Sequence, residues 1–191
     1  MNTAVISKNR LSIKSQTLYA FIAVIAAVAV PQIFHAIGYL SSAGTAAGEI
    51  FLPMHLPIIL VGLLAGQYAG AAAGILAPLA SFAFTTAAFG AAMPAKIMLP
   101  FMCAELLGYG LCAGLLSKTK MPMAAKVLLT QIGGRALRFG TVAVAIFAFD
   151  SPVALTSVWT ATTKGLAGIV LQLVLIPLVM YRIENGKSNE Q

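Results

Sequence analysis

Three charged side chains lie inside stretches of sequence that are otherwise apolar: Glu105, Arg135 and Arg138. A charged group at the centre of a membrane helix costs roughly 2.5–3.5 kcal/mol on insertion scales, so it normally faces a bundle interior, a partner or a ligand. One carboxylate can pair with one guanidinium group, which leaves a second cation for an anionic group on a ligand. These three residues are therefore the centre of a candidate binding site.

The composition places this site in a membrane. The 191-residue chain is 60% hydrophobic and 9% charged, whereas about 25% of residues are charged in an ordinary soluble domain. We therefore predict an all-α integral membrane protein. The net charge is +7, but the basic residues lie at the ends of apolar segments and form no aromatic-studded patch, so nucleic acid is not an expected partner.

Familiar catalytic motifs are missing from the sequence. It contains no phosphate-binding loop, no His-Glu-x-x-His pattern and no Gly-x-Ser-x-Gly nucleophile turn, and it has few acidic residues for a metal cluster. We therefore expect a protein that is not an enzyme and that needs no cofactor and no metal.

Gly, Pro and charged residues divide the apolar sequence into segments, each interpreted as a membrane span because a span needs about 20 residues. The second and third segments, at 50–66 and 68–88, are separated by so few residues that they must form an antiparallel pair. The second is short enough to be tilted or partly re-entrant. The predicted spans are 17–39, 50–66, 68–88, 96–117, 124–149 and 159–182, with a cytoplasmic N-terminal segment 1–16, a membrane domain 17–182 and a cytoplasmic tail 183–191.

Basic residues near the ends of spans predict the orientation, because cytoplasmic connections are enriched in Lys and Arg. Eight of the twelve fall on one side under the six-span division: Lys8, Arg10, Lys14, Lys118, Lys120, Lys126, Arg182 and Lys187. This predicts a multi-pass protein of the cell membrane with both termini in the cytoplasm. A cleaved signal peptide is the alternative, since a basic start, an apolar stretch and Ala27-Val28-Ala29 mimic its three parts.

Small residues recur at intervals of four in the second and third segments, and this spacing lets helix backbones approach closely in lipid. The repeats are Gly62, Gly66, Gly70 and Gly74, and Ala65, Ala69, Ala73 and Ala77. Ala23 and Ala27 carry the same spacing in the first span. Packing within the chain and docking of another membrane subunit are both compatible with this pattern.

The depth of each charged residue follows from a rise of 1.5 Å per residue, which puts Glu105 about 12–14 Å from the outer end of its helix. Arg138 then lies about 16 Å and Arg135 about 21 Å from the outer end of theirs. Consecutive antiparallel helices can therefore bring Glu105 near Arg138, and less easily near Arg135. Glu105 is either a ligand contact or the partner of one of these arginines.

Two further polar residues extend the candidate site. Tyr109 shares a helix face with Glu105 because it follows four residues later. His55 lies between Pro53 and Pro57, where a disturbed helix frees backbone carbonyls, so it contacts either a ligand or the local backbone. The connections at 40–49, 85–95 and 150–158 are expected to seal the ligand. The predicted binding residues are His55, Glu105, Tyr109, Arg135 and Arg138.

Several short sequence motifs lie within roughly residues 45–182. Their order and spacing resemble those of the S components of energy-coupling factor (ECF) transporters. These motifs are the run from Glu49 to Gly70 with Pro-Met-His-Leu-Pro at 53–57, Gly74-Ile-Leu-Ala-Pro, the run from Met98 to Gly110, Gly133-Gly-Arg, and Gly168-Ile-Val-Leu-Gln-Leu. The resemblance implies a six-helix protein that binds a vitamin, a vitamin precursor or a metal ion from outside. It also implies a transmembrane coupling subunit and two cytoplasmic ATPases as partners, with Ala23 and Ala27 at the coupling-subunit contact.

The resemblance also bears on the substrate. Metal-binding members carry an early Met-His ligand set, and this chain begins Met1-Asn2-Thr3, so a metal substrate is not expected. Two arginines against one glutamate favour an anionic vitamin, with a pantothenate-like acid as the first candidate. A neutral pyrimidine or pyridine precursor is the alternative if Glu105 binds a ring amine or hydroxyl.

Two other classes of protein are also open. An intramembrane enzyme could use Glu105 or His55 for acid–base chemistry, although no nucleophile or metal set accompanies them. A structural membrane subunit would assemble through its Gly and Ala faces and bind no small molecule.

Overall fold

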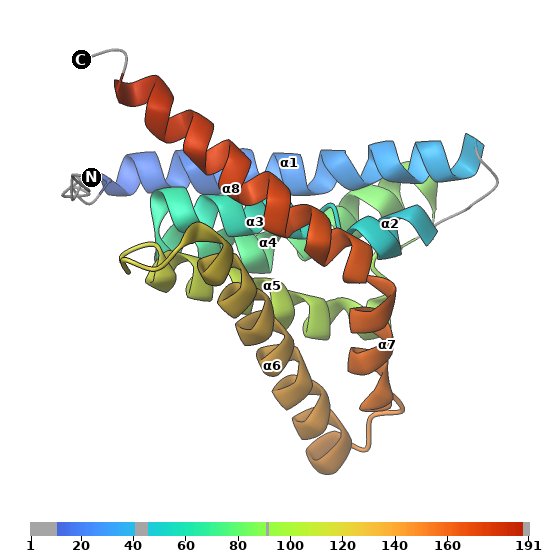
Figure 1. Cartoon of the computed structure of the whole chain (residues 1–191). Helices are drawn as coiled ribbons and strands as arrows, with labels where there is room; N and C mark the ends of the chain where they lie inside the picture. The colour runs from blue at the N-terminus through green and yellow to red at the C-terminus, as the bar shows by residue number, and fades with distance from the viewer. Residues whose placement is uncertain (1–10, 41–45, 91, 189–191) are drawn as a thin grey trace.

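The structure is a computed structural model that describes residues 11–40, 46–90 and 92–188, and within these ranges the regular elements are all helical (Figure 1). The prediction of an all-α membrane protein is confirmed. The elements are α1 Ile13–Leu40, α2 Ala46–Phe51, α3 His55–Ala65, α4 Gln67–Phe89, the 3₁₀ turn η1 Lys96–Met98, α5 Leu99–Leu116, α6 Met123–Phe149, α7 Thr156–Lys164 and α8 Leu166–Ser188.

Five stretches of the described chain are long and apolar enough to cross a membrane: most of α1, α4, η1 with α5, α6, and most of α8. The third, fourth and fifth predicted segments agree with α4, η1 with α5, and α6 to within two residues at each end. Gly66 alone separates α3 from α4, so the expected tight turn between the second and third segments is present.

The second predicted span is wrong as a single helix. The chain leaves helical geometry at Leu52, which has a positive φ of 49°. Pro53 follows, and a proline cannot donate a backbone hydrogen bond and disfavours helical geometry in the residue before it. The 11 residues of α3 are too few to cross a bilayer alone, since a span needs about 20.

The sixth predicted span is also divided. It covers part of α7 and most of α8, which are separated at Gly165. Of this region, Leu166–Ile183 is long and apolar enough to span. The first part of the predicted span, including Trp159, is instead the end of a short helix, α7, that leads into α8.

The helix α5 lies at the centre of the bundle, in contact with α3, α4 and α6. On the far side of α3 and α4 lies α1, which packs against both, whereas α8 packs against α2, α3 and α6. In Figure 1, α6 runs outward from the bundle and α7 returns toward it. Residues on α5 can therefore meet side chains from both α3 and α6.

Glycines bring the α4 and α5 backbones together. A Cβ built on Gly110 would overlap the Gly70 carbonyl, and one built on Gly74 would overlap the Leu106 carbonyl. The next residues on the α4 face, Ala73 and Ala77, are fully buried. The small-residue repeat of the third segment is thus used for packing within the chain, as small-xxx-small faces commonly are in lipid.

The start of α1, the end of α8 and the connection between α5 and α6 gather at one end of the bundle (Figure 1). The ends of α1 and α8 that lead toward the two termini therefore lie at the same end of the bundle. The side that faces the cytoplasm stays a prediction. Lys8 and Arg10, on which it partly depends, lie outside the described residues.

Candidate functional site

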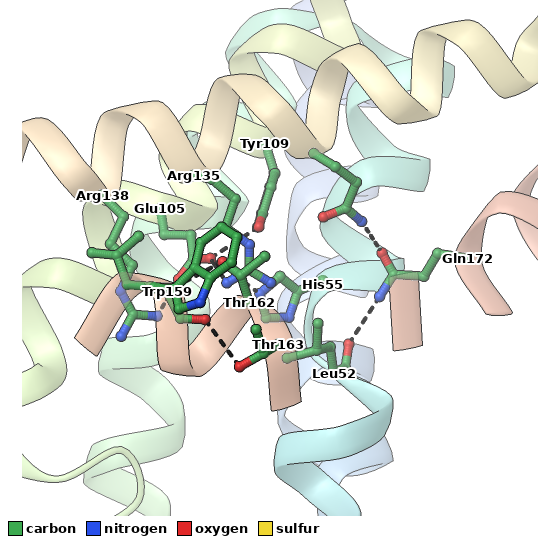
Figure 2. A network of polar contacts seen from close by, with 12 residues as sticks. Leu52, His55, Glu105, Tyr109, Arg135, Arg138, Trp159, Thr162, Thr163 and Gln172 are labelled. Atoms are coloured by element: carbon green, nitrogen blue, oxygen red, sulfur yellow. Dashed lines mark hydrogen bonds and ion pairs between the residues drawn. The ribbon is translucent and has the colours of Figure 1, made fainter. Parts of the chain in front are cut away.

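Glu105 on α5 pairs with both arginines of α6. Its Oε1 lies 2.8 Å from Nη1 of Arg135, and its Oε2 lies 2.7 Å from Nη1 of Arg138 (Figure 2). The arginines are three residues apart, so they share a helix face and both reach the same carboxylate. The expected contact with Arg138 is confirmed, and Arg135, which was expected to reach Glu105 less easily, pairs with it equally closely.

Two aromatic side chains complete the cluster around this carboxylate. The Tyr109 hydroxyl donates a hydrogen bond of 2.9 Å to Oε1 of Glu105. The Nε2 atom of His55 lies 3.9 Å from the same oxygen, and its ring centroid is 5.0 Å from that of Tyr109. The structure therefore brings the five predicted binding residues together where α3, α5 and α6 meet (Figure 2).

The cluster carries an excess of buried positive charge. The Glu105 side chain is 2% exposed, and those of Arg135 and Arg138 are 12% and 11% exposed. Two guanidinium groups and one carboxylate leave one cationic charge without compensation among these three residues. Removing ions from water costs several kcal/mol per ion even after relaxation, so an additional anionic partner would stabilise this arrangement.

Several nitrogen atoms of the cluster are buried and make no hydrogen bond with any described residue. They are Nε and Nη2 of Arg135, Nε of Arg138, and both ring nitrogens of His55. Buried polar groups are nearly always hydrogen-bonded, and leaving one unpaired costs about 1–3 kcal/mol. The arginines thus keep hydrogen-bonding capacity that no described residue uses.

A cavity of about 700 Å³ lies at this cluster, and His55, Glu105, Arg135 and Arg138 line it. Its size falls within the roughly 300–1,000 Å³ of small-molecule sites. Tyr109 is not among the described lining residues, so it acts on the site through Glu105. The other described residues lining the cavity include the thioethers Met54, Met93, Met98 and Met102, the hydroxyls Ser81, Thr156, Ser157 and Thr160, and His35 and Lys164.

Unpartnered polar atoms gather at this cavity beyond the charged cluster. The Ser157 hydroxyl and Nδ1 of His35 also line it, and they too are buried without a hydrogen-bond partner in the described chain. The expected sealing connections contribute Gly48, Ala92 to Ala95 and Ala154 to the wall. Residues 41–45 of the first connection lie outside the described residues.

One part of the wall is held by hydroxyl groups that the sequence analysis missed. Ser81 and Thr85 on α4 donate hydrogen bonds of 2.9 and 3.2 Å to the Met93 carbonyl. The Met93 amide in turn donates a hydrogen bond of 2.9 Å to Oγ1 of Thr85. The sequence feature that could have indicated this contact is the spacing of Ser81 and Thr85, which lie four residues apart on one face of an otherwise apolar helix.

A pair of buried glutamines fixes the chain where α3 begins. The side-chain amide of Gln131 on α6 donates to that of Gln172 on α8. Gln172 donates in turn, at 3.3 Å, to the Leu52 carbonyl, which also accepts the His55 backbone amide at 3.1 Å (Figure 2). The glutamines therefore help to place His55 beside Glu105.

We expect Gln172→Leu to lower the free energy of unfolding by about 1–3 kcal/mol, because Gln131 is left with an unpaired buried amide. The measurement is thermal unfolding in detergent. The double variant Gln131→Leu with Gln172→Leu is the control, and it should lose less than the sum of the two single variants, since both partners are then apolar. Strict additivity would mean that the glutamines do not interact.

The two alanines predicted to contact a coupling subunit pack inside this chain. Ala23 is 6% exposed and Ala27 is fully buried, in the same core as residues of α3 and α4. The outer face of α1 instead carries large apolar side chains: Leu18, Tyr19, Phe21, Ile22 and Ile25. The contact with a coupling subunit stays a prediction.

Within the described ranges, no group of three or more His, Cys, Asp or Glu side chains is placed to hold a metal ion. Comparisons with protein-family models, curated proteins and solved structures find no match for this chain.

Proposed function

We propose that this chain is the substrate-binding membrane subunit, or S component, of an ECF-type importer. It binds a small water-soluble vitamin or vitamin precursor from outside, and a transmembrane coupling subunit with two cytoplasmic ATPases completes the transporter. The observation that carries this proposal is the gathering of buried, unpartnered polar atoms on one cavity of ligand size inside a membrane protein.

The sequence resemblance supports the same site. The Pro-Met-His-Leu-Pro phrase supplies His55, the run from Met98 to Gly110 supplies Glu105 and Tyr109, and Gly133-Gly-Arg supplies Arg135. These phrases are far apart in the sequence, yet their polar residues meet around one carboxylate. If these motifs matched only because hydrophobic sequences resemble one another, their polar residues would not be expected to meet at one site.

Binding fits the geometry better than catalysis does. Both oxygens of Glu105 are engaged by other side chains: Oε1 accepts a hydrogen bond from Tyr109 and forms an ion pair with Arg135, and Oε2 accepts a hydrogen bond from Arg138. Hydrogen bonds and nearby cations stabilise the ionised form of a carboxylate, which makes it a weak base. A general base must also be free to reach the proton that it removes.

The charge of the site favours an anionic substrate. The cluster has one buried positive charge in excess, and the unpartnered nitrogens of its arginines are donors. Charge-assisted hydrogen bonds to such an anion are roughly twice as strong as neutral ones. A pantothenate-like acid is therefore the first substrate to test.

Arg135→Ala should weaken substrate binding by at least 30-fold, because truncating a buried charged partner costs 2–5 kcal/mol or more, and about 1.4 kcal/mol is tenfold. The chain is purified in detergent, any small molecule that co-purifies is identified by mass spectrometry, and that compound or a vitamin panel is titrated by calorimetry.

Arg182→Ala is the matched control, because Arg182 is exposed on α8 and does not line the cavity. It should bind like the wild type. Equal binding by Arg135→Ala and wild type would remove the proposed site, whereas a wild type that binds no member of the panel would favour a structural membrane subunit.

A further inference from the structure

The helix α7 lines the cavity with one polar face. Five of its nine residues line the cavity, and their spacing places them on a single side of the helix: Thr156, Ser157, Thr160, Ala161 and Lys164. Three of the five carry a hydroxyl group, and the sequence analysis assigned none of the five as a binding residue. The short helix α7 therefore adds neutral polar side chains to a site whose charged cluster comes from other helices.

The hydroxyl proton of Thr160 is already used within α7. The hydroxyl donates a hydrogen bond of 3.0 Å to the Thr156 carbonyl, one turn earlier. A threonine hydroxyl has one proton and two lone pairs, and a carbonyl oxygen can only accept. The oxygen of Thr160 is therefore left with the capacity to accept a hydrogen bond, and not to donate a second one.

Ser81 on α4 shows the same pattern. It also lines the cavity, and its hydroxyl donates a hydrogen bond of 2.9 Å to the Met93 carbonyl. Ser81 is 2% exposed, whereas Thr160 is exposed. Thr160 is therefore the hydroxyl of this kind that a ligand reaches more readily.

The polar groups of the cavity differ in what they can bind. The guanidinium groups of Arg135 and Arg138 are donors without acceptors, so they suit a carboxylate or another anion, which only accepts. The oxygen of Thr160 has the opposite character, because its proton is committed to the helix backbone. An anion cannot satisfy this oxygen, whereas an O–H or N–H group of a ligand can donate to it.

From these observations we infer that the ligand carries, besides its anionic group, a neutral hydroxyl or N–H group that donates a hydrogen bond to Oγ1 of Thr160. Thr160 is then a specificity-determining residue, and an acid that lacks such a donor binds less tightly. This inference rests on the proposed function and deepens it, because it assumes that the cavity binds a substrate.

The first test uses the wild-type chain in detergent and compares acids that carry neutral donors with acids that lack them. The probes are pantoate with 3,3-dimethylbutanoate, and pantothenate with N-(3,3-dimethylbutanoyl)-N-methyl-β-alanine. A co-purifying compound is compared with its O- or N-methylated derivative. On the scaffold that binds most tightly, we expect the compound with the donor to bind at least about fivefold more tightly, which is the size expected for one hydrogen bond.

A substitution of Thr160 connects this preference to its hydroxyl. Thr160→Val replaces the hydroxyl with a methyl group and keeps the branched shape of the side chain. It should weaken binding of the donor-bearing acid by about fivefold and change the affinity of the donor-free acid by less than about twofold. Thr160→Ser keeps the hydroxyl and should restore the preference of the wild type.

Thr163→Val is the matched control, because Thr163 is also exposed on α7 but does not line the cavity. Its hydroxyl likewise donates to backbone carbonyls of α7, at 3.2 Å to Trp159 and 3.0 Å to Thr160 (Figure 2). Both valine variants therefore lose a bond to the helix backbone, and only Thr160→Val should lose affinity for the donor-bearing acid. Equal losses in the two variants would overturn the inference.

The outcomes separate the inference from the proposed function. If the wild type binds donor-bearing and donor-free acids equally, or if the co-purifying compound has no O–H or N–H group, the inference is overturned while the binding function stands. If neither a probe nor a co-purifying compound binds, the proposed function fails as well. Each variant is first checked for a single symmetric elution peak, and the wild-type comparison decides the question if Thr160→Val does not fold.

Discussion

Glu105→Ala is expected to lower the free energy of unfolding by about 3–5 kcal/mol, because it leaves two buried guanidinium groups without their carboxylate. Both oxygens of Glu105 are engaged with Arg135 and Arg138 at 2.7–2.8 Å, so a single substitution removes two ion pairs. The Tyr109 hydroxyl loses its acceptor as well. Thermal or denaturant unfolding in detergent measures the loss.

A variant that removes all three charges tests the cause of this loss. With Glu105→Leu, Arg135→Leu and Arg138→Met combined, no buried charge of the cluster stays unpaired, and apolar replacements of buried ion pairs are often neutral or stabilising. We expect this triple variant to be more stable than Glu105→Ala and to bind no ligand. A triple variant as unstable as Glu105→Ala would show that shape, and not charge, sets the stability.

Gly110→Ala is expected to destabilise the chain by about 1–3 kcal/mol through overpacking. The added methyl group overlaps the Gly70 backbone across the α4–α5 contact. Backbone atoms cannot move aside as the end of a flexible side chain can, so the two helices must separate. Thermal unfolding in detergent is again the measurement.

Gly140→Ala is the matched control because Gly140 also lies inside a long helix, α6, but has open space where a Cβ would be. Alanine is favoured over glycine in a helix interior by up to about 1 kcal/mol. Gly140→Ala should therefore be neutral or stabilising. If the two glycine variants lose stability equally, close backbone packing at Gly110 is not the reason.

The charged cluster could be predicted from the sequence because its members lie on two consecutive helices. The depth of Glu105 and Arg138 follows from the helical rise alone, and Tyr109 is found by its spacing of four. Arg135 was expected to reach Glu105 less easily, because it lies deeper. Both arginines lie on one face of α6, and their long side chains reach the same carboxylate from successive turns.

The break before α3 could not be predicted with the same precision. Pro53 signals a disturbance, but the left-handed conformation of Leu52 is supported by a hydrogen bond from Gln172, which lies 120 residues away. No local pattern encodes such a contact. The hydrogen bonds that hold the cavity wall at Met93 were also missed, and they come from hydroxyl groups of the preceding helix, whose spacing was visible in the sequence.

The order of Glu105 and its partners along the chain bears on biogenesis. The ribosome completes α5 before it makes either arginine, so an α5 that entered the bilayer alone would carry a lone ionised group, at a cost of roughly 2.5–3.5 kcal/mol. The connection from Leu116 to Met123 is short, and α6 brings both counter-charges to the same carboxylate. The hairpin of α5 and α6 is therefore the smallest unit in which the negative charge of Glu105 is compensated, and its joint insertion avoids exposing Glu105 to lipid.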